Sequence, residues 1–292
     1  MPPRIRTGGR SLAPELVAHL DRWVAEQPFS IDLHSGDVGW HLRHDDEALD
    51  GAFLGWEVDG GLAAAGLLDG GVLRTSVAPA HRHDEALATV VADGCAGLGY
   101  VDASAGTALR DELLRRGWSA DPDPWVLLHR PLTERDAPPD DPATRPLDGP
   151  DDVAARVAVQ RSAFAPGSTF TPELWRRMAD GPTYDPRFEM LTWTPDGEPA
   201  AAATGWFAGT GRCAILEPVG THADHQRRGY GRRANLAVLG ALARAGAGGV
   251  RVHTPASNEA AVRAYESCGL RAVDWTVALV APGRHDGGHP SG

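Results

Sequence analysis

Long hydrophobic runs are missing from this chain of 292 residues. A membrane-spanning helix needs about 18 or more consecutive apolar residues, and no such run occurs. The N-terminal residues 1–6 include two arginines, and no apolar segment follows them as it would in a secretory leader. We therefore expect no membrane partner and a cytoplasmic location.

Cysteine is equally scarce, with only Cys95, Cys213 and Cys268 in the whole chain. They are widely spaced and form no Cys-x-x-Cys pair, which argues against a disulfide framework and against a zinc site. We expect no metal. The formal net charge of −11 makes nucleic acid an improbable main partner. The hydrophobic content of 42% is sufficient for packed cores, and the length allows one large domain or two of about 150 residues.

One stretch near the C-terminal end stands out against this acidic background. Residues 217–233 read EPVGTHADHQRRGYGRR, which predicts a strand, a tight turn and the start of a helix. Gly229 and Gly231 lie where the first amide groups of that helix have no intrahelical partner, and several arginines surround them. Such a turn favours a multiply phosphorylated ligand. A phosphate loop of the nucleotide-binding type is a weaker alternative, since the Lys-Ser/Thr pair of such loops is absent.

A second segment follows at a fixed distance. Residues 250–254 alternate as a strand should, and a helix is predicted from Ser257 or Asn258 to Gly269. Asn258, Val262 and Tyr265 are spaced by four and three residues, so they share one helix face.

Together the two segments, Gln-x-x-Gly-x-Gly and Asn-x-x-Ala-x-x-x-Tyr-x-x-x-Gly-Leu, resemble the GCN5-related N-acetyltransferase (GNAT) superfamily. The resemblance implies a mixed α/β fold, with a mostly antiparallel sheet flanked by helices, and acetyl-CoA as cosubstrate. It implies that the diphosphate lies on the backbone of the glycine turn, with Asn258 near the pantetheine arm. The cofactor-binding residues expected from it are Val219, Gly220, Thr221, Gln226, Arg227, Arg228, Gly229, Tyr230, Gly231, Arg232 and Asn258.

The order of predicted elements occurs twice, which indicates two tandem copies of one fold. We place the first copy at residues 1–135, a Pro- and Asp-rich linker at 136–148, the second copy at 149–283 and a tail at 284–292. In the first copy an offset of 144 puts Glu85 at the position of Gly229 and Leu87 at that of Gly231. A carboxylate and a bulky side chain there oppose a diphosphate, so we expect only the second copy to bind it. This arrangement resembles that of mycothiol synthases.

Two residues are the candidates for acyl-transfer chemistry. Tyr265, which the resemblance places beside the thioester sulfur, is the candidate acid, because a phenol with a pKa of about 10 can donate to a thiolate of about 8.5. Glu217 is the candidate base, since burial beside Leu216 and Pro218 raises a carboxyl pKa; a substrate clamp is the alternative role. A backbone N–H of residues 219–221 is a candidate oxyanion donor.

The expected function is therefore transfer of an acetyl group to a primary amine of a small molecule by a monomer or homodimer. A CoA-binding or sensing module without catalysis, and a protein or peptide amine acetyltransferase, are the alternatives. Aromatic residues of the second copy form either an acceptor pocket or ordinary core. They are Phe164, Phe170, Trp175, Trp193, Trp206 and Phe207.

Four further expectations concern the organisation of the chain. Residues 1–10 read as a loose tail, and residues 29–40 as strand and turn. Residues 125–129 are predicted to form the last strand of the first copy, and residues 271–280 that of the second.

Overall fold

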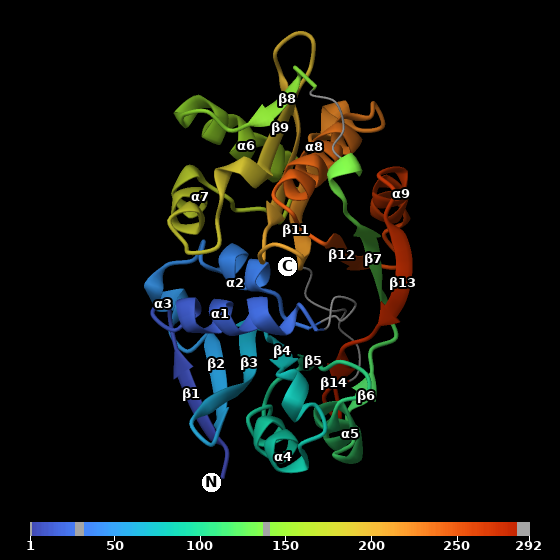
Figure 1. Cartoon of the computed structure of the whole chain (residues 1–292). Helices are drawn as coiled ribbons and strands as arrows, with labels where there is room; N and C mark the ends of the chain where they lie inside the picture. The colour runs from blue at the N-terminus through green and yellow to red at the C-terminus, as the bar shows by residue number, and fades with distance from the viewer. Residues whose placement is uncertain (1, 27–31, 137–140, 285–292) are drawn as a thin grey trace.

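The structure is a computed structural model that describes residues 2–26, 32–136 and 141–284. These residues form two layered α/β halves, each built on a mixed, mostly antiparallel sheet with flanking helices (Figure 1). None of the described helices combines the length and apolarity needed to cross a membrane.

The first sheet has the order β1-β2-β3-β4-β5-β14-β6. Its strands are β1 (Arg4–Gly8), β2 (Phe53–Val58), β3 (Gly61–Asp69), β4 (Val72–Val77), β5 (Tyr100–Asp102), β6 (Ser119–Ala120) and β14 (Leu279–Val280). Its helices are α1 (Ala13–Trp23), α2 (Ser35–His41), α3 (Asp46–Leu49), α4 (Glu85–Asp93) and α5 (Ala108–Arg115).

The second sheet has the order β13-β7-β12-β11-β10-β9-β8. Its strands are β7 (Trp125–Pro131), β8 (Thr144–Pro146), β9 (Glu189–Trp193), β10 (Pro199–Trp206), β11 (Cys213–Thr221), β12 (Gly249–Pro255) and β13 (Arg271–Thr276). Its helices are α6 (Pro150–Ala163), α7 (Pro172–Ala179), α8 (Tyr230–Arg244) and α9 (Glu259–Ser267).

The two sheets exchange a strand. β7 follows the elements of the first half but pairs with β12 along its whole length and with β13 on its other side. In return the chain leaves β13 and ends as β14 between β5 and β6 of the first sheet (Figure 1). Val126 and Leu128 of β7 are buried in the core of the second half, and Leu279 of β14 is buried in that of the first. The halves delimited from the sequence therefore do not coincide with the sheets at β7 and β14, and residues 271–280 are two strands.

Two N-terminal expectations were wrong. The expected tail contains β1, an edge strand paired with β2. Its residues Arg4, Ile5 and Arg6 are all exposed, so the sequence shows no alternation of apolar and polar residues there. Ladder hydrogen bonds to β2 hold the strand, and Arg6 lies 3.0 Å from Glu57 in an ion pair. The described part of the expected strand at 29–40 contains α2, whose first turn is closed by a reciprocal capping box between His34 and Asp37.

The linker expectation also needs correction. Residues 144–146 form β8, an edge strand that pairs with β9. Asp141 makes an ion pair with Arg233 of α8, with 2.6 Å between Nε and Oδ2. Residues 137–140 of the expected linker lie outside the described residues. The connection is therefore attached to the second half on both sides of that gap.

Candidate active site

The second sheet opens between its parallel strands β11 and β12. The two strands pair at three positions, from Cys213 opposite Gly249 to Ile215 opposite Arg251, although β11 continues to Thr221. From residue 216 onward β11 has β10 on one side and no strand partner among the described residues on the other. A strand edge of this kind can accept an extended ligand through main-chain hydrogen bonds. It contains the expected contact residues 219–221.

The start of α8 lies beside this edge, and its first amides have no partner among the described residues. Gly229 precedes the helix with φ of +84°, and no side chain caps it. Arg227 also has a positive φ, +59°, which a non-glycine residue adopts at a cost in backbone strain. None of the amides of residues 227–232 donates to another described residue. These convergent N–H groups, at the positive end of the helix dipole, provide the geometry that phosphate oxygens require.

Glycine at position 231 allows the helix to approach β11. A Cβ atom there would lie 2.5 Å from the hydroxyl oxygen of Thr221, well inside van der Waals contact. A Cβ at Gly220 would likewise meet the Cβ of Ala163 at 2.8 Å. Gly231 therefore lets the start of α8 lie close to the strand edge, and Gly220 lets the end of α6 pack against that edge.

The four arginines of the turn do not all face a ligand. Arg227 and Arg228 are exposed and make no ion pair with another described residue. Arg232 donates from Nε to the carbonyl of Ser267 at 3.0 Å, and Arg233 forms two hydrogen bonds to Asp141. The positive charge left for phosphates is therefore that of Arg227 and Arg228, together with the helix amides.

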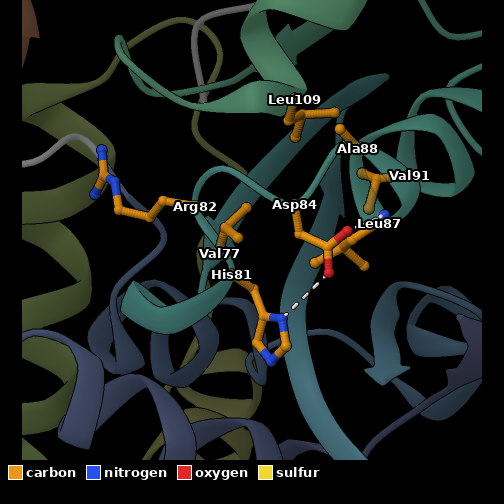
Figure 2. Close-up of a pocket in the computed structure, with 8 residues that line it drawn as sticks. All are labelled: Val77, His81, Arg82, Asp84, Leu87, Ala88, Val91 and Leu109. Carbon is orange, nitrogen blue, oxygen red and sulfur yellow. Dashed lines mark hydrogen bonds and ion pairs between the residues drawn. The ribbon is translucent and has the colours of Figure 1, made fainter. Parts of the chain in front are cut away.

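The equivalent helix start in the first half is closed by its own chain. The carboxylate of Asp84 accepts a hydrogen bond of 3.0 Å from the amide of Leu87 and caps α4, and this bond lowers the pKa of Asp84. His81 lies 3.4 Å from the same carboxylate (Figure 2). The space enclosed here is too small for a water molecule. The residues around it are Val77, His81, Arg82, Asp84, Leu87, Ala88, Val91 and Leu109.

This comparison corrects the sequence register by one residue. The helices begin at Glu85 and Tyr230, so Gly229 corresponds to Asp84 and not to Glu85. The second copy has one additional residue between its short 3₁₀ turn and its helix, and a constant offset cannot show this. The corrected register strengthens the expectation that the first half binds no diphosphate at this helix start, because the Asp84 carboxylate already accepts a hydrogen bond from a first-turn amide.

Glu217 lies on β11 at a bulge, where three steps along β11 oppose two along β10. Its side chain is partly buried and interacts with the carboxyl group of Asp37. Burial and the charge of Asp37 raise the pKa of Glu217 to about 8, while Arg74 and Arg43 act in the opposite direction. The carboxyl group is therefore poised to exchange a proton near neutral or mildly basic pH.

Asp37 keeps its charge although it is only 2% exposed. Its carboxylate lies 2.9 Å from the guanidinium of Arg74 and accepts a hydrogen bond of 2.7 Å from the backbone N–H of His34. Burial is the largest single influence and opposes ionisation, but the Arg74 guanidinium, the Glu217 carboxyl and His34 together outweigh it and lower the pKa of Asp37 to about 2. Because one carboxyl is held ionised, the proton between the two belongs to Glu217.

Sequence reasoning missed Asp37, Arg74 and Arg43, since all three belong to the first half. The capping box at His34 and Asp37 and the Gly-x-x-Gly spacing at 36 and 39 were the available signals for α2. Nothing in the sequence pattern placed that helix against β10 and β11 of the second half, where Figure 1 shows it between the two sheets.

Tyr265 lies on α9 in the core of the second half and is 8% exposed. Burial, and then the negative charge of Glu217, raise the pKa of its phenol above the usual range. The group therefore stays protonated and can donate a hydrogen bond. Asn258 has a structural task as the N-cap of α9, accepting from the amide of Ala261 at 3.2 Å. Its Oδ1 is thus already bonded within the helix.

The histidines of the turn have other partners. His225 is buried, and its Nε2 lies 3.3 Å from a carboxylate oxygen of Glu198. His222 accepts from the amide of Asp224. Neither arrangement points to a base.

Most of the candidate aromatic residues belong to the core. Trp206 is 1% exposed and donates to the carbonyl of Glu217 at 2.6 Å, and Phe207 packs against Phe188. Trp175 donates to the buried carboxylate of Glu189. Phe164 is the exception, being 39% exposed and adjacent to the strand edge at residue 220.

The comparisons with known proteins agree with this fold. Residues 158–270 match the family model described as Acetyltransferase (GNAT) family. A GCN5-related N-acetyltransferase from Sphaerobacter thermophilus is similar, with 21% identity and a TM-score of 0.56, over 95% of this chain and 94% of that one. A GNAT-family acetyltransferase from Colwellia psychrerythraea has 16% identity and a TM-score of 0.60, over 95% and 98%.

A third similar structure is a tandem GNAT protein from the clavulanic acid biosynthesis pathway. Its identity is 13% and its TM-score 0.58, and the match covers 97% of this chain and the whole of that one. No functionally curated protein matches this chain. The two halves therefore have the fold of a tandem GNAT protein, and residues 158–270 of the second half match the acetyltransferase (GNAT) family.

Proposed function

We propose that the chain transfers an acetyl group from acetyl-CoA to a primary amine of a small molecule, and that the second half performs the reaction. One observation carries the proposal. The uncapped start of α8 lies beside the unpaired edge of β11, and that strand contains Glu217. An anion site, a main-chain edge and a titrating carboxyl thus follow one another in the order in which diphosphate, pantetheine and reacting centre occur in an acyl-CoA.

The residues present fit this cosubstrate. The amides of residues 227–232 would hold the diphosphate, with Arg227 and Arg228 free to add charge-assisted hydrogen bonds. The backbone of residues 219–221 would pair with the pantetheine amides. In the first half the Asp84 carboxylate takes the place of the phosphate, which supports binding in the second half alone.

The chemistry follows from two titrating groups. Acetyl-CoA supplies a thioester, and the amine nitrogen forms a bond to its carbonyl carbon while the carbon–sulfur bond breaks. Glu217, when ionised, accepts the proton that the nitrogen loses. Tyr265, which stays protonated, stabilises the departing thiolate by donating a hydrogen bond. Glu217 then releases its proton to solvent and the thiolate takes one up, so that overall a proton replaces the acetyl group on sulfur.

Two measurements test the proposal. Calorimetry with CoA should show binding to the wild-type protein. Release of free thiol from acetyl-CoA should appear when a panel of small amines is offered. Tight CoA binding without turnover of any small amine or lysine peptide would favour a sensing module. Turnover of the lysine peptide alone would favour a protein acetyltransferase.

A further inference from the structure

A short helix of the first half meets the proposed reaction centre of the second. α2 packs against β10 and β11, and the glycines at 36 and 39 make this approach possible. A Cβ at Gly36 would lie 2.5 Å from the Cβ of Trp206, and one at Gly39 would lie 2.6 Å from its ring. Trp206 in turn donates its indole N–H to the carbonyl of Glu217. α2 thus contacts β11 directly at Ile215, where a Cβ at Gly36 would lie 2.6 Å from Cγ2, and indirectly through Trp206 of β10.

We propose that Asp37 of the first half is a positioning residue for Glu217: through a shared proton and an ion pair with Arg74, it orients the carboxyl that accepts the proton of the amine. The first half, without an open anion site of its own, thereby completes the reaction centre of the second. This inference rests on the proposed function of Glu217 and extends it to a residue from the other half.

The position of Asp37 is fixed on several sides. The backbone N–H of His34 donates to its Oδ2, and the ring of His34 caps the same helix while its Nε2 lies 3.0 Å from the carbonyl of Cys213 on β11. Two residues before His34, the carbonyl of Asp32 accepts a hydrogen bond of 2.8 Å from the buried Arg251 of β12. α2 is therefore held against the second sheet by polar contacts at its first turn.

The pairing of two carboxyl groups follows from charge. Two carboxylates in hydrogen-bonding contact cannot both be ionised without strong repulsion. Arg74 selects Asp37 as the ionised member, because its Nη2 lies 2.9 Å from Oδ1 of Asp37. Glu217 is then the protonated member and donates to Asp37. This hydrogen bond fixes the direction of the Glu217 carboxyl until it ionises.

The other charged and titratable groups around the pair do not remove this asymmetry. Arg43 and Arg74 favour ionisation of Glu217, and Tyr265 lies within reach of its charge. Around Arg74 lie Asp69 and Asp102. Burial keeps two neighbouring histidines neutral, with pKa values of about 4 for His34 and about 3 for His253. The like charge of Asp37 is the group that opposes ionisation of Glu217 most directly.

Two substitutions make opposite predictions. Asp37→Asn removes the like charge and frees Arg74 to face Glu217, so the carboxyl should titrate at lower pH. Arg74→Gln removes the cation that favours ionisation, so the carboxyl should titrate at higher pH. Asp84→Asn is the matched control, because it makes the same change at a helix cap of the first half, distant from β11.

The titration is read by ¹³C NMR of protein labelled at the glutamate carboxyl carbon, with Glu217 assigned from its loss in Glu217→Gln. We expect Asp37→Asn to move the midpoint down by at least about one pH unit, which is at least a tenfold change in the ionised fraction at pH 6. Arg74→Gln should move it up, and Asp84→Asn should leave it in place. The pH dependence of kcat/KM should shift in the same directions.

The outcomes separate the inference from the proposed function. If Asp37→Asn and Arg74→Gln leave the titration where it is in the wild type, the inference is overturned, even if amines are acetylated. If the titration shifts as described but the wild type acetylates no amine, the coupling is supported and the proposed function fails. A merely structural role would lower activity in both variants without opposite shifts. Unchanged CoA binding by calorimetry shows that each variant is folded.

Discussion

Replacing Glu217 by glutamine tests the proton-accepting role, since it removes one titrating group and keeps the shape of the side chain. The folded protein holds the pKa of this carboxyl at about 8. The base is therefore ionised in about one molecule in a hundred at pH 6 and in about half at pH 8. Each pH unit below 8 should lower the concentration of active base about tenfold.

The measurement is kcat/KM for one small amine between about pH 6 and pH 9.5, in wild type and Glu217→Gln. Protonation of the amine itself affects both proteins equally. Below pH 8 the slope of log kcat/KM against pH should therefore be steeper by one in the wild type. At pH 8.5 the variant should be slower by roughly 10² to 10⁴, the usual contribution of a general base.

Urea unfolding gives a second reading that needs no turnover. The pKa of Glu217 is raised from 4.5 to about 8 on folding, so its contribution to stability is complete below pH 4.5 and is lost as the pH rises to about 8. Glutamine has no such dependence. The unfolding free energy of the variant minus that of the wild type should therefore increase with pH up to about pH 8 and then stay constant. Equal rate slopes in the two proteins, together with a constant stability difference, would refute the reasoning.

Three further predictions concern the coenzyme site and the acid. Gly231→Ala should weaken CoA binding at least about tenfold by calorimetry, because the added methyl group overlaps Thr221 of β11. The control is Gly61→Ala, where a Cβ meets only one atom within 4 Å. Equal CoA affinities of Gly231→Ala and the wild type would contradict binding at the start of α8. Arg228→Ala should lower CoA affinity by about tenfold or more and reduce its salt dependence, whereas Arg233→Ala, which loses a partner within the protein, should change it less. Tyr265→Phe should lower kcat in the thiol-release assay with CoA affinity unchanged; an unaltered kcat would remove the acid role.

The second half was largely predictable because its signals are local. The glycine turn, the strand before it and the cap at Asn258 each depend on residues close in sequence, and the structure places these elements as expected. The fold class was implied by the resemblance of these segments to the GNAT superfamily, and the two mixed, mostly antiparallel sheets confirm it. The turn between β2 and β3 has a similarly local origin, since Asp59 and Gly60 both take the positive φ that a tight hairpin turn requires.

What could not be predicted depends on contacts between distant residues. The apolar residues of β7 suit either sheet, so alternation alone cannot say that Leu128 is buried in the second core. The placement of Asp37 beside Glu217 requires two glycines to fit a tryptophan about 170 positions later, and no periodicity encodes that. The bonds of Arg232 and Arg233 within the chain could not be predicted for the same reason, since their partners Ser267 and Asp141 are remote in sequence.

The reciprocal exchange of β7 and β14 makes each half depend on the other for a complete sheet. Removing the first copy would deprive the second sheet of the strand between β12 and β13, and removing the C-terminus would open the first sheet between β5 and β6. Neither half therefore completes its sheet without residues from the other.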